Sequence, residues 1–112
     1  MAAGKYDIVI DQGSSFGLDL TVQESGSAKD LSDYNVRGQI RPTVTSSTLT
    51  ASFTGTVTNA AQGKINLALT ATTTSGISSG KYFYDIEIFT ANDAVVTRLL
   101  QGTATVSPEV TR

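Results

Sequence analysis

The sequence predicts one all-β domain, an immunoglobulin-like antiparallel β-sandwich of about seven strands with at most one short helix. Three observations support this: apolar and polar residues alternate in several segments, Thr, Ser and Gly are abundant, and turn residues separate the segments. The 112 residues have the size of one ordinary domain, so residues 1–112 are assigned to a single unit. A small barrel is the alternative architecture.

Period-two alternation marks four strands that each have one apolar face: 16–23, 34–41, 51–57 and 64–70. Gly38 falls on the apolar face of its strand and leaves a gap for a neighbouring aromatic ring. A short first strand covers 6–10, and 71–77 is the one segment with helical character. We expect these residues in the core: Leu18, Leu20, Ile40, Phe53, Leu67, Tyr84, and Leu99 or Leu100.

Two further strands, 81–90 and 94–106, carry apolar residues on both faces and are joined by turn residues 91–93, which predicts a hairpin. Near-continuous hydrophobicity indicates central strands, or strands whose outer face contacts a partner. The alternative is that the 71–77 helix and the 26–34 loop cover the outer face of these two strands within one monomer.

Composition excludes several classes of function. The net charge is −2 and the eight basic residues are scattered, so no nucleic-acid partner is expected. No apolar run at the start resembles a secretory signal and none is long enough to cross a bilayer, so we expect a soluble protein without a membrane partner. The absence of Cys and His removes disulfides, thiolate metal sites and the commonest general base.

The carboxylates remain as candidates for acid–base or metal chemistry. Asp85 and Glu87, two residues apart on one strand, are better explained as a solvated face or as partners of Arg98 than as a hydrolase pair. Asp30 and Asp33 are better explained as turn formers than as calcium ligands. We therefore predict no catalytic residue, no metal site, no cofactor and no small-molecule substrate.

Aromatic residues offer a different kind of site. Tyr82, Phe83 and Tyr84 could in principle stack on a sugar, but packing within the sheet is the favoured interpretation. A protein contact is the stronger hypothesis for exposed apolar positions. The candidate interface residues are Phe83, Phe89, Val96, Leu100, Pro108 and Val110. The chain ends, 1–5 and 107–112, are expected to fray alone and to order against neighbours in an assembly.

Five stretches together resemble a known family. They are Tyr6–Gly13 followed by Phe16, then Asp30–Arg41, Gly63–Thr70, Gly80–Ile88, and Arg98–Gly102 with Val106 and Pro108–Arg112. Their order and spacing are similar to small structural proteins of tailed-bacteriophage virions, in particular the N-terminal β-sandwich domain of phage baseplate upper proteins. In that family an extended segment ending in Gln-Gly precedes an aromatic residue and an apolar strand.

The resemblance implies a structural, non-enzymatic role in the virion, assembled in the host cytoplasm. Because the sequence ends at Arg112 before any distal domain, we expect a stand-alone accessory module rather than a fibre adaptor. It would bind other virion proteins, and homo-oligomers are allowed. Tail or baseplate is the expected place, and the alternatives are capsid decoration of the phage head or a carbohydrate-binding host-adhesion module.

Overall fold

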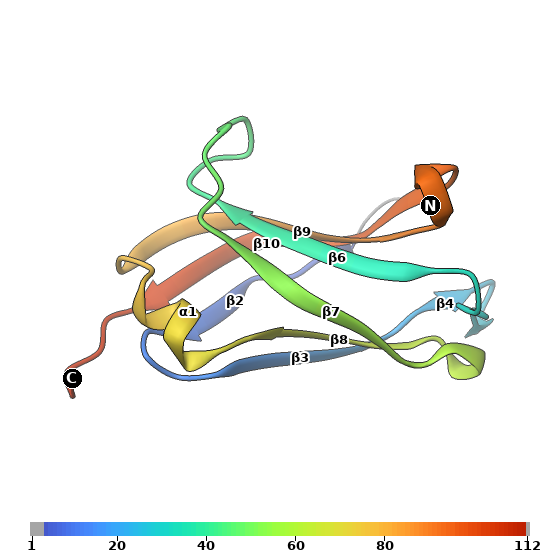
Figure 1. The fold of residues 1–112 in the computed structure, drawn as a ribbon, viewed down its shortest axis with the longest axis horizontal. Helices are drawn as coiled ribbons and strands as arrows, with labels where there is room; N and C mark the ends of the chain where they lie inside the picture. Colours follow the sequence, from blue (N-terminus) through green and yellow to red (C-terminus); the bar gives the residue numbers. More distant parts are fainter. Residues whose placement is uncertain (1–3, 112) are drawn as a thin grey trace.

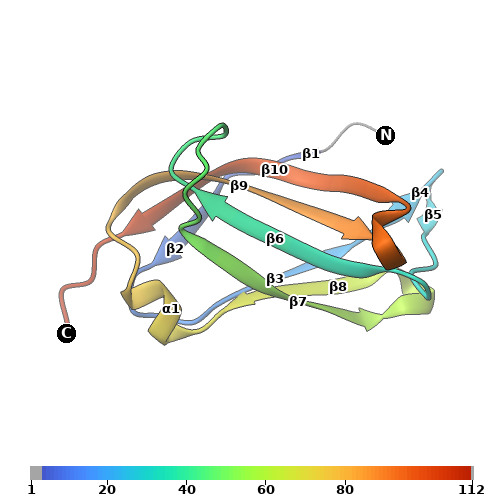
Figure 2. The ribbon, with the colours of Figure 1, turned by 45° about the horizontal axis from the view of Figure 1, so that its top comes forward.

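The computed structural model describes residues 4–111, so the expected roles of Met1–Ala3 and Arg112 lie outside the described residues. The chain forms two stacked β layers, which confirms the predicted fold class (Figures 1 and 2). The strands are β1 (Gly4–Lys5), β2 (Ile8–Asp11), β3 (Phe16–Thr21), β4 (Gln23–Glu24), β5 (Ser27–Ala28), β6 (Asn35–Arg41), β7 (Ala51–Asn59), β8 (Lys64–Leu69), β9 (Gly80–Phe89) and β10 (Val96–Ser107). The helices are η1 (Ala60–Gln62), α1 (Ala71–Ser75) and η2 (Ala91–Asp93).

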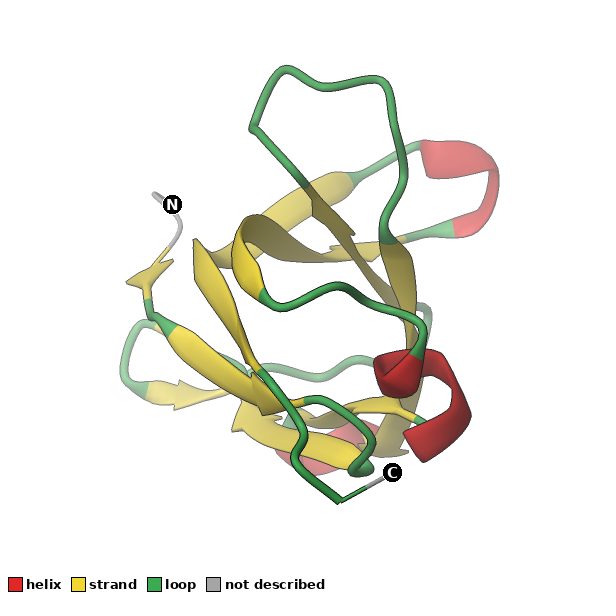
Figure 3. Cartoon of the chain, turned by 90° about the vertical axis from the view of Figure 1, so that its left-hand side faces the viewer, coloured by secondary structure: helices red, strands yellow, loops and turns green. Residues whose placement is uncertain are grey.

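Hydrogen bonding joins the two layers into one curled sheet with the strand order β1-β10-β9-β6-β7-β8-β3, and β2 pairs in parallel with β10. Strand β7 makes the corner, because its first residues pair with β6 and its later residues pair with β8. Figure 3 shows the curl end-on. The small β4–β5 hairpin stands apart as a second sheet.

Close packing at the corner follows from Gly38 on β6. A Cβ there would lie 3.0 Å from the Phe53 ring and 2.8 Å from the backbone oxygen of Asp85. The aromatic ring therefore fills the space that the missing side chain leaves, as the sequence predicted. The Phe53 ring also meets Tyr84 edge-on, with ring centroids 6.2 Å apart.

The core lies between the two layers, and most of its expected members are confirmed. Ile40, Phe53, Leu67 and Tyr84 are buried. The expectation was too strong for Leu18, Leu20, Leu99 and Leu100, which pack against the core but are only half-buried. Leu18 and Leu20 are on an edge strand, so one flank of each side chain stays open to solvent.

Loops close the two ends of the sandwich. The predicted helix exists but is shorter than 71–77, because it ends at Ser75 before Gly76. Its Thr74 is fully buried, and the hydroxyl donates to the Ser14 carbonyl (2.8 Å) and accepts from the Gly13 amide (3.1 Å). At the opposite end Leu31, 1% exposed, plugs the core. Both segments seal ends of the sandwich and leave the outer face of β9 open (Figure 1).

Between residues 4 and 111, no helix is long and apolar enough to cross a membrane.

Candidate functional site

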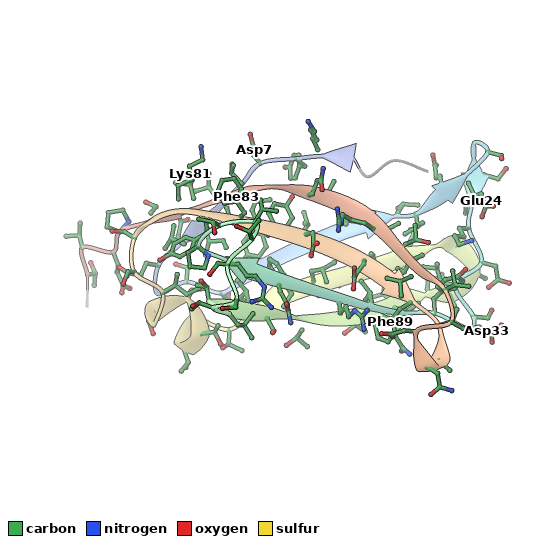
Figure 4. All side chains as sticks on the ribbon, turned by 90° about the horizontal axis from the view of Figure 1, so that it is seen from above. Asp7, Glu24, Asp33, Lys81, Phe83 and Phe89 are labelled. Carbon is green, nitrogen blue, oxygen red and sulfur yellow. The ribbon has the colours of Figure 1, made fainter. Side chains whose placement is uncertain are left out.

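The candidate site is the outer face of β6, β9 and β10. Strand register arranges its side chains in four cross-strand rows, because paired residues share a face of the sheet. From one end to the other the rows are Asn35–Phe89–Val96, Arg37–Glu87–Arg98, Gln39–Asp85–Gln101 and Arg41–Phe83–Thr103. Phe83 and Phe89 thus lie toward opposite ends of β9, separated by charged rows (Figure 4).

The charged rows are held by ion pairs. The Nε atom of Arg37 lies 2.6 Å from a carboxylate oxygen of Glu87, and one of its terminal nitrogens lies 3.3 Å from Asp93. Arg98 pairs with Asp85 at 3.3 Å, as the sequence predicted, whereas Glu87 takes its closest partner from β6. The Arg37 guanidinium also stacks over the Phe89 ring, 4.2 Å from the centroid.

These contacts shift the protonation equilibria of the face. The hydrogen bond that Arg37 donates to the Glu87 carboxylate raises the pKa of Arg37, so the guanidinium stays charged. Burial raises the pKa of Asp85 above the usual value for a carboxyl, and the neighbouring Arg98 opposes that shift. Burial therefore disfavours the charged form of the Asp85 carboxyl.

A clamp holds the chain near its start against β10. The Tyr84 hydroxyl donates to the Tyr6 carbonyl, and the Tyr6 amide donates to the Gln101 carbonyl at 2.9 Å. Asp7 accepts from the Thr103 amide at 3.1 Å, and this hydrogen bond lowers the pKa of its carboxyl. A Cβ at Gly102 would meet the Tyr6 carbonyl oxygen at 2.1 Å, so only glycine permits this crossing.

A groove of about 720 Å³ runs over the Phe83 end of the face. The clamp segment Lys5–Asp7 lines one side of the groove, and Thr43 and Val44 of the 42–50 loop line the other. This loop projects from the sandwich (Figure 3). Arg41 steadies this loop by donating to the Ser46 carbonyl at 3.3 Å. Val44 in this loop is 77% exposed and Tyr6 on the opposite side is 53% exposed. The groove thus combines a floor of paired polar groups with apolar rims.

The structure separates the six candidate interface residues. Phe83, Phe89 and Val96 share the outer face, the first two half-buried and Val96 43% exposed. Leu100 pairs with the buried Ile86 on the inner face, because the strand register shifts between Arg98 and Leu100. Such a bulge leaves no reliable mark in the sequence.

Pro108 and Val110 lie beyond β10, which ends at Ser107 just before Pro108, as the sequence predicted. Both side chains are exposed, and Val110 reaches 92%. The described parts of both chain ends are tied to the domain, since Gly4–Lys5 pairs with β10 and the Glu109 amide donates to the Gln12 side chain at 3.0 Å. Their anchoring role in an assembly stays a prediction.

Sequence reasoning missed the groove walls. Arg37 and Arg41 were visible as outward-facing residues of an alternating strand. The stacking of Arg37 on Phe89 depends on strand order, whereas the hydrogen bond from Arg41 to Ser46 depends on the conformation of the following loop. Val44 lies in a loop without periodicity, so no pattern marked it. In the turn at 30–33, Asp30 accepts from the Ser32 amide at 3.0 Å, the turn-forming role predicted for it, and the Ser32 hydrogen bonds lower its pKa.

Comparisons with known proteins bear on the fold alone. No protein-family model matches the sequence. No curated protein matches it either. Among solved structures, the crystal structure of Listeria monocytogenes InlP is similar with a TM-score of 0.50 and 19% sequence identity. The similarity covers 94% of this chain and 27% of the InlP chain. At this identity the match supports a shared β architecture and transfers no activity.

Proposed function

We propose that this chain is a non-enzymatic structural protein of a tailed-phage virion, an accessory module that binds other virion proteins in the tail or baseplate. The family resemblance of the sequence motivates the setting. The outer face of β6, β9 and β10 supports a binding role, because Phe83 and Phe89 flank two rows that contain paired charges.

The composition of this face suits a protein contact. Protein interfaces are enriched in aromatic residues and Arg, and here three Arg side chains and two Phe rings share one face with Val96. Arg37 and Glu87 are already paired within the chain, as are Arg98 and Asp85, so a partner need not neutralise these four charges on binding. Val44 on the projecting loop adds an apolar contact that solvent now surrounds.

Incorporation into particles tests the proposal. A tagged wild-type copy supplied during infection should appear in purified particles by mass spectrometry, and gold-labelled antibody against the tag should mark tails. The Val44→Asp variant should be depleted from particles because a charge replaces the exposed apolar side chain of the loop. Val9→Asp is the matched control, since Val9 is also an exposed valine (63%) but does not line the groove. Absence of the wild-type protein from particles would refute the proposal, and labelling of heads would favour capsid decoration.

One observation favours a second candidate, a carbohydrate-binding adhesion module. Tyr6 and Phe83 both line the groove beside Gln39, Asp85 and Gln101, and sugars are bound by aromatic faces with planar polar groups. Titration with a panel of bacterial surface glycans separates the candidates. Saturable glycan binding that Tyr6→Ala abolishes would support adhesion. The absence of glycan binding would favour the proposed protein contact.

A further inference from the structure

Strand β3 is an unpaired edge of the curled sheet. It ends the strand order and, among the described strands, pairs only with β8. The pairing is regular over six consecutive residues without a bulge. The opposite edge is protected differently, because pairing to β10 breaks at Tyr6–Asp7 between the short strands β1 and β2. Strand β3 contains no Pro, Lys or Arg, and Asp19 is its only charge. Natural proteins usually blunt such an edge.

The inner side chains of β3 show that the edge lacks a neighbour. Phe16, Leu18 and Leu20 point toward the core but remain half-exposed. Their cross-strand partners on β8, with exposures of 4%, 0% and 1%, are fully buried: Leu69, Leu67 and Ile65. The two strands carry similar side chains, so their difference in burial comes from position. A strand added beside β3 would cover this apolar row.

Backbone geometry fixes which groups such a strand would meet. The Val22 amide donates to the Gly63 carbonyl at 2.7 Å, which continues the β3–β8 ladder by one pair. In an antiparallel ladder alternate residues point their N–H and C=O groups to opposite sides. Leu18 and Leu20, in phase with Val22, therefore direct these groups to β8, whereas Gly17 and Asp19 direct theirs to the open edge.

We propose that the occupant of this edge is a second copy of the chain, paired antiparallel through β3 about a two-fold axis at Leu18. In this register each Phe16 faces the partner's Leu20, and the two Leu18 side chains face each other. On the outer face Gly17 lies opposite the partner's Asp19, so the two carboxylates do not meet. The register centred on Asp19 would put like charges directly opposite, which is unfavourable.

The strand is thus complementary to itself in both apolar pattern and charge, and two-fold pairing closes the contact without further growth. Two strands of six residues bury less than the roughly 1,200 Å² of a stable complex. We therefore expect a weak dimer that depends on concentration. This inference is independent of the proposed role in a virion.

Substitutions of Gly17 test the proposed dimer, because a negative and a positive side chain there should shift its dissociation constant in opposite directions. No described atom lies within 4 Å of a Cβ placed on Gly17, so the monomer accepts a side chain there. Gly17→Asp sets two new carboxylates against the partner's Asp19 and should raise the dimer dissociation constant by about tenfold. Gly17→Lys creates two favourable pairs and should lower it several-fold. Sedimentation velocity over a wide range of protein concentration measures both, and circular dichroism confirms that each variant is folded.

The matched controls are Thr56→Asp and Thr56→Lys, on an exposed position of β7 in the interior of the sheet. Both should leave the dissociation constant unchanged. A wild-type protein that stays monomeric up to near-millimolar concentration would overturn the inference. So would shifts in the same direction for Gly17→Asp and Gly17→Lys, because the proposed register requires opposite signs.

Discussion

Tyr84→Phe should weaken the clamp and abolish one part of the alkaline sensitivity of the fold. Tyr84 is 4% exposed, and its hydroxyl donates to the Tyr6 carbonyl. Removal of the hydroxyl leaves that carbonyl without this donor, which should cost about 1 kcal/mol of unfolding free energy at neutral pH. Lys5 and Tyr6 should exchange their amide hydrogens faster, because the clamp that holds them is weaker.

The pH dependence follows from the phenol itself. Burial raises the pKa of Tyr84 from 10.0 to about 12. In the unfolded chain the phenol loses its proton near pH 10, so between pH 10 and 12 the unfolded state binds fewer protons than the folded state. This contribution to stability is therefore fully present below pH 10 and is lost as the pH rises through 12. At about 1.36 kcal/mol per pKa unit, its size is at most about 2.7 kcal/mol.

Urea unfolding of both proteins at several pH values from 7 to 12 measures the effect. The wild-type free energy should fall more steeply above pH 10 than that of Tyr84→Phe. The neutral-pH lead of about 1 kcal/mol should therefore shrink, and the two curves should cross if the loss approaches its upper limit of about 2.7 kcal/mol. Tyr82→Phe is the control, because the Tyr82 hydroxyl donates to the Ser78 carbonyl at 2.7 Å at an exposed position. Parallel curves for wild type and Tyr84→Phe between pH 10 and 12 would show that this phenol does not titrate with the fold.

Three further predictions concern packing and charge. Leu67→Ala should lower the unfolding free energy by about 2–5 kcal/mol because Leu67 is fully buried. Leu18→Ala should lower it clearly less because Leu18 is half-exposed. Equal losses of unfolding free energy in chemical denaturation would contradict the assignment of Leu18 to an edge strand. Gly38→Ala should cost about 1–3 kcal/mol, since its Cβ would press on the Asp85 carbonyl oxygen, whereas Gly17→Ala in dilute protein should be neutral or stabilising, as thermal unfolding would show. Asp85→Asn should raise the unfolding free energy at neutral pH, because the raised pKa of Asp85 means that the folded state disfavours the charged carboxylate. As the pH falls toward 4 and Asp85 takes up a proton, the wild-type unfolding free energy should rise relative to that of the variant. A variant that is less stable than wild type at pH 7 would mean that the ion pair with Arg98 outweighs the cost of burial.

The alternation of apolar residues predicted the strands well because burial on one face of a pleated sheet imposes a period of two. It placed Ile40 and Leu67 in the core and Gly38 against an aromatic ring. The same rule overestimated the burial of Leu18 and Leu20. Alternation indicates which way a side chain points, whereas burial also depends on whether a strand has a neighbour on each side, and strand order is a long-range property.

The candidate site shows the same limit. The sequence pointed to Phe83, Phe89 and Val96, and they share one outer face. It placed Leu100 with them, but a register shift beyond Arg98 turns Leu100 inward. The pairing of Arg98 with Asp85 was foreseen from adjacency in a hairpin, while the pairing of Arg37 with Glu87 required knowing that β6 lies beside β9. Local pairs can be inferred from sequence, and non-local ones need the topology.

The two proposed contacts use opposite layers of the sandwich, and this separation has a measurable consequence. The β3 edge belongs to the layer of β7 and β8 (Figures 1 and 2). The groove beside Phe83 lies instead on the outer face of β6, β9 and β10. No described residue lines the groove and also belongs to β3. Substitutions without shared contacts act additively. Gly17→Asp should therefore weaken self-association whether or not Val44→Asp is present, and Val44→Asp should not alter the dimer dissociation constant. If Val44→Asp weakens the dimer, the two copies meet through the loop and the groove, and the β3 edge is not the site of pairing.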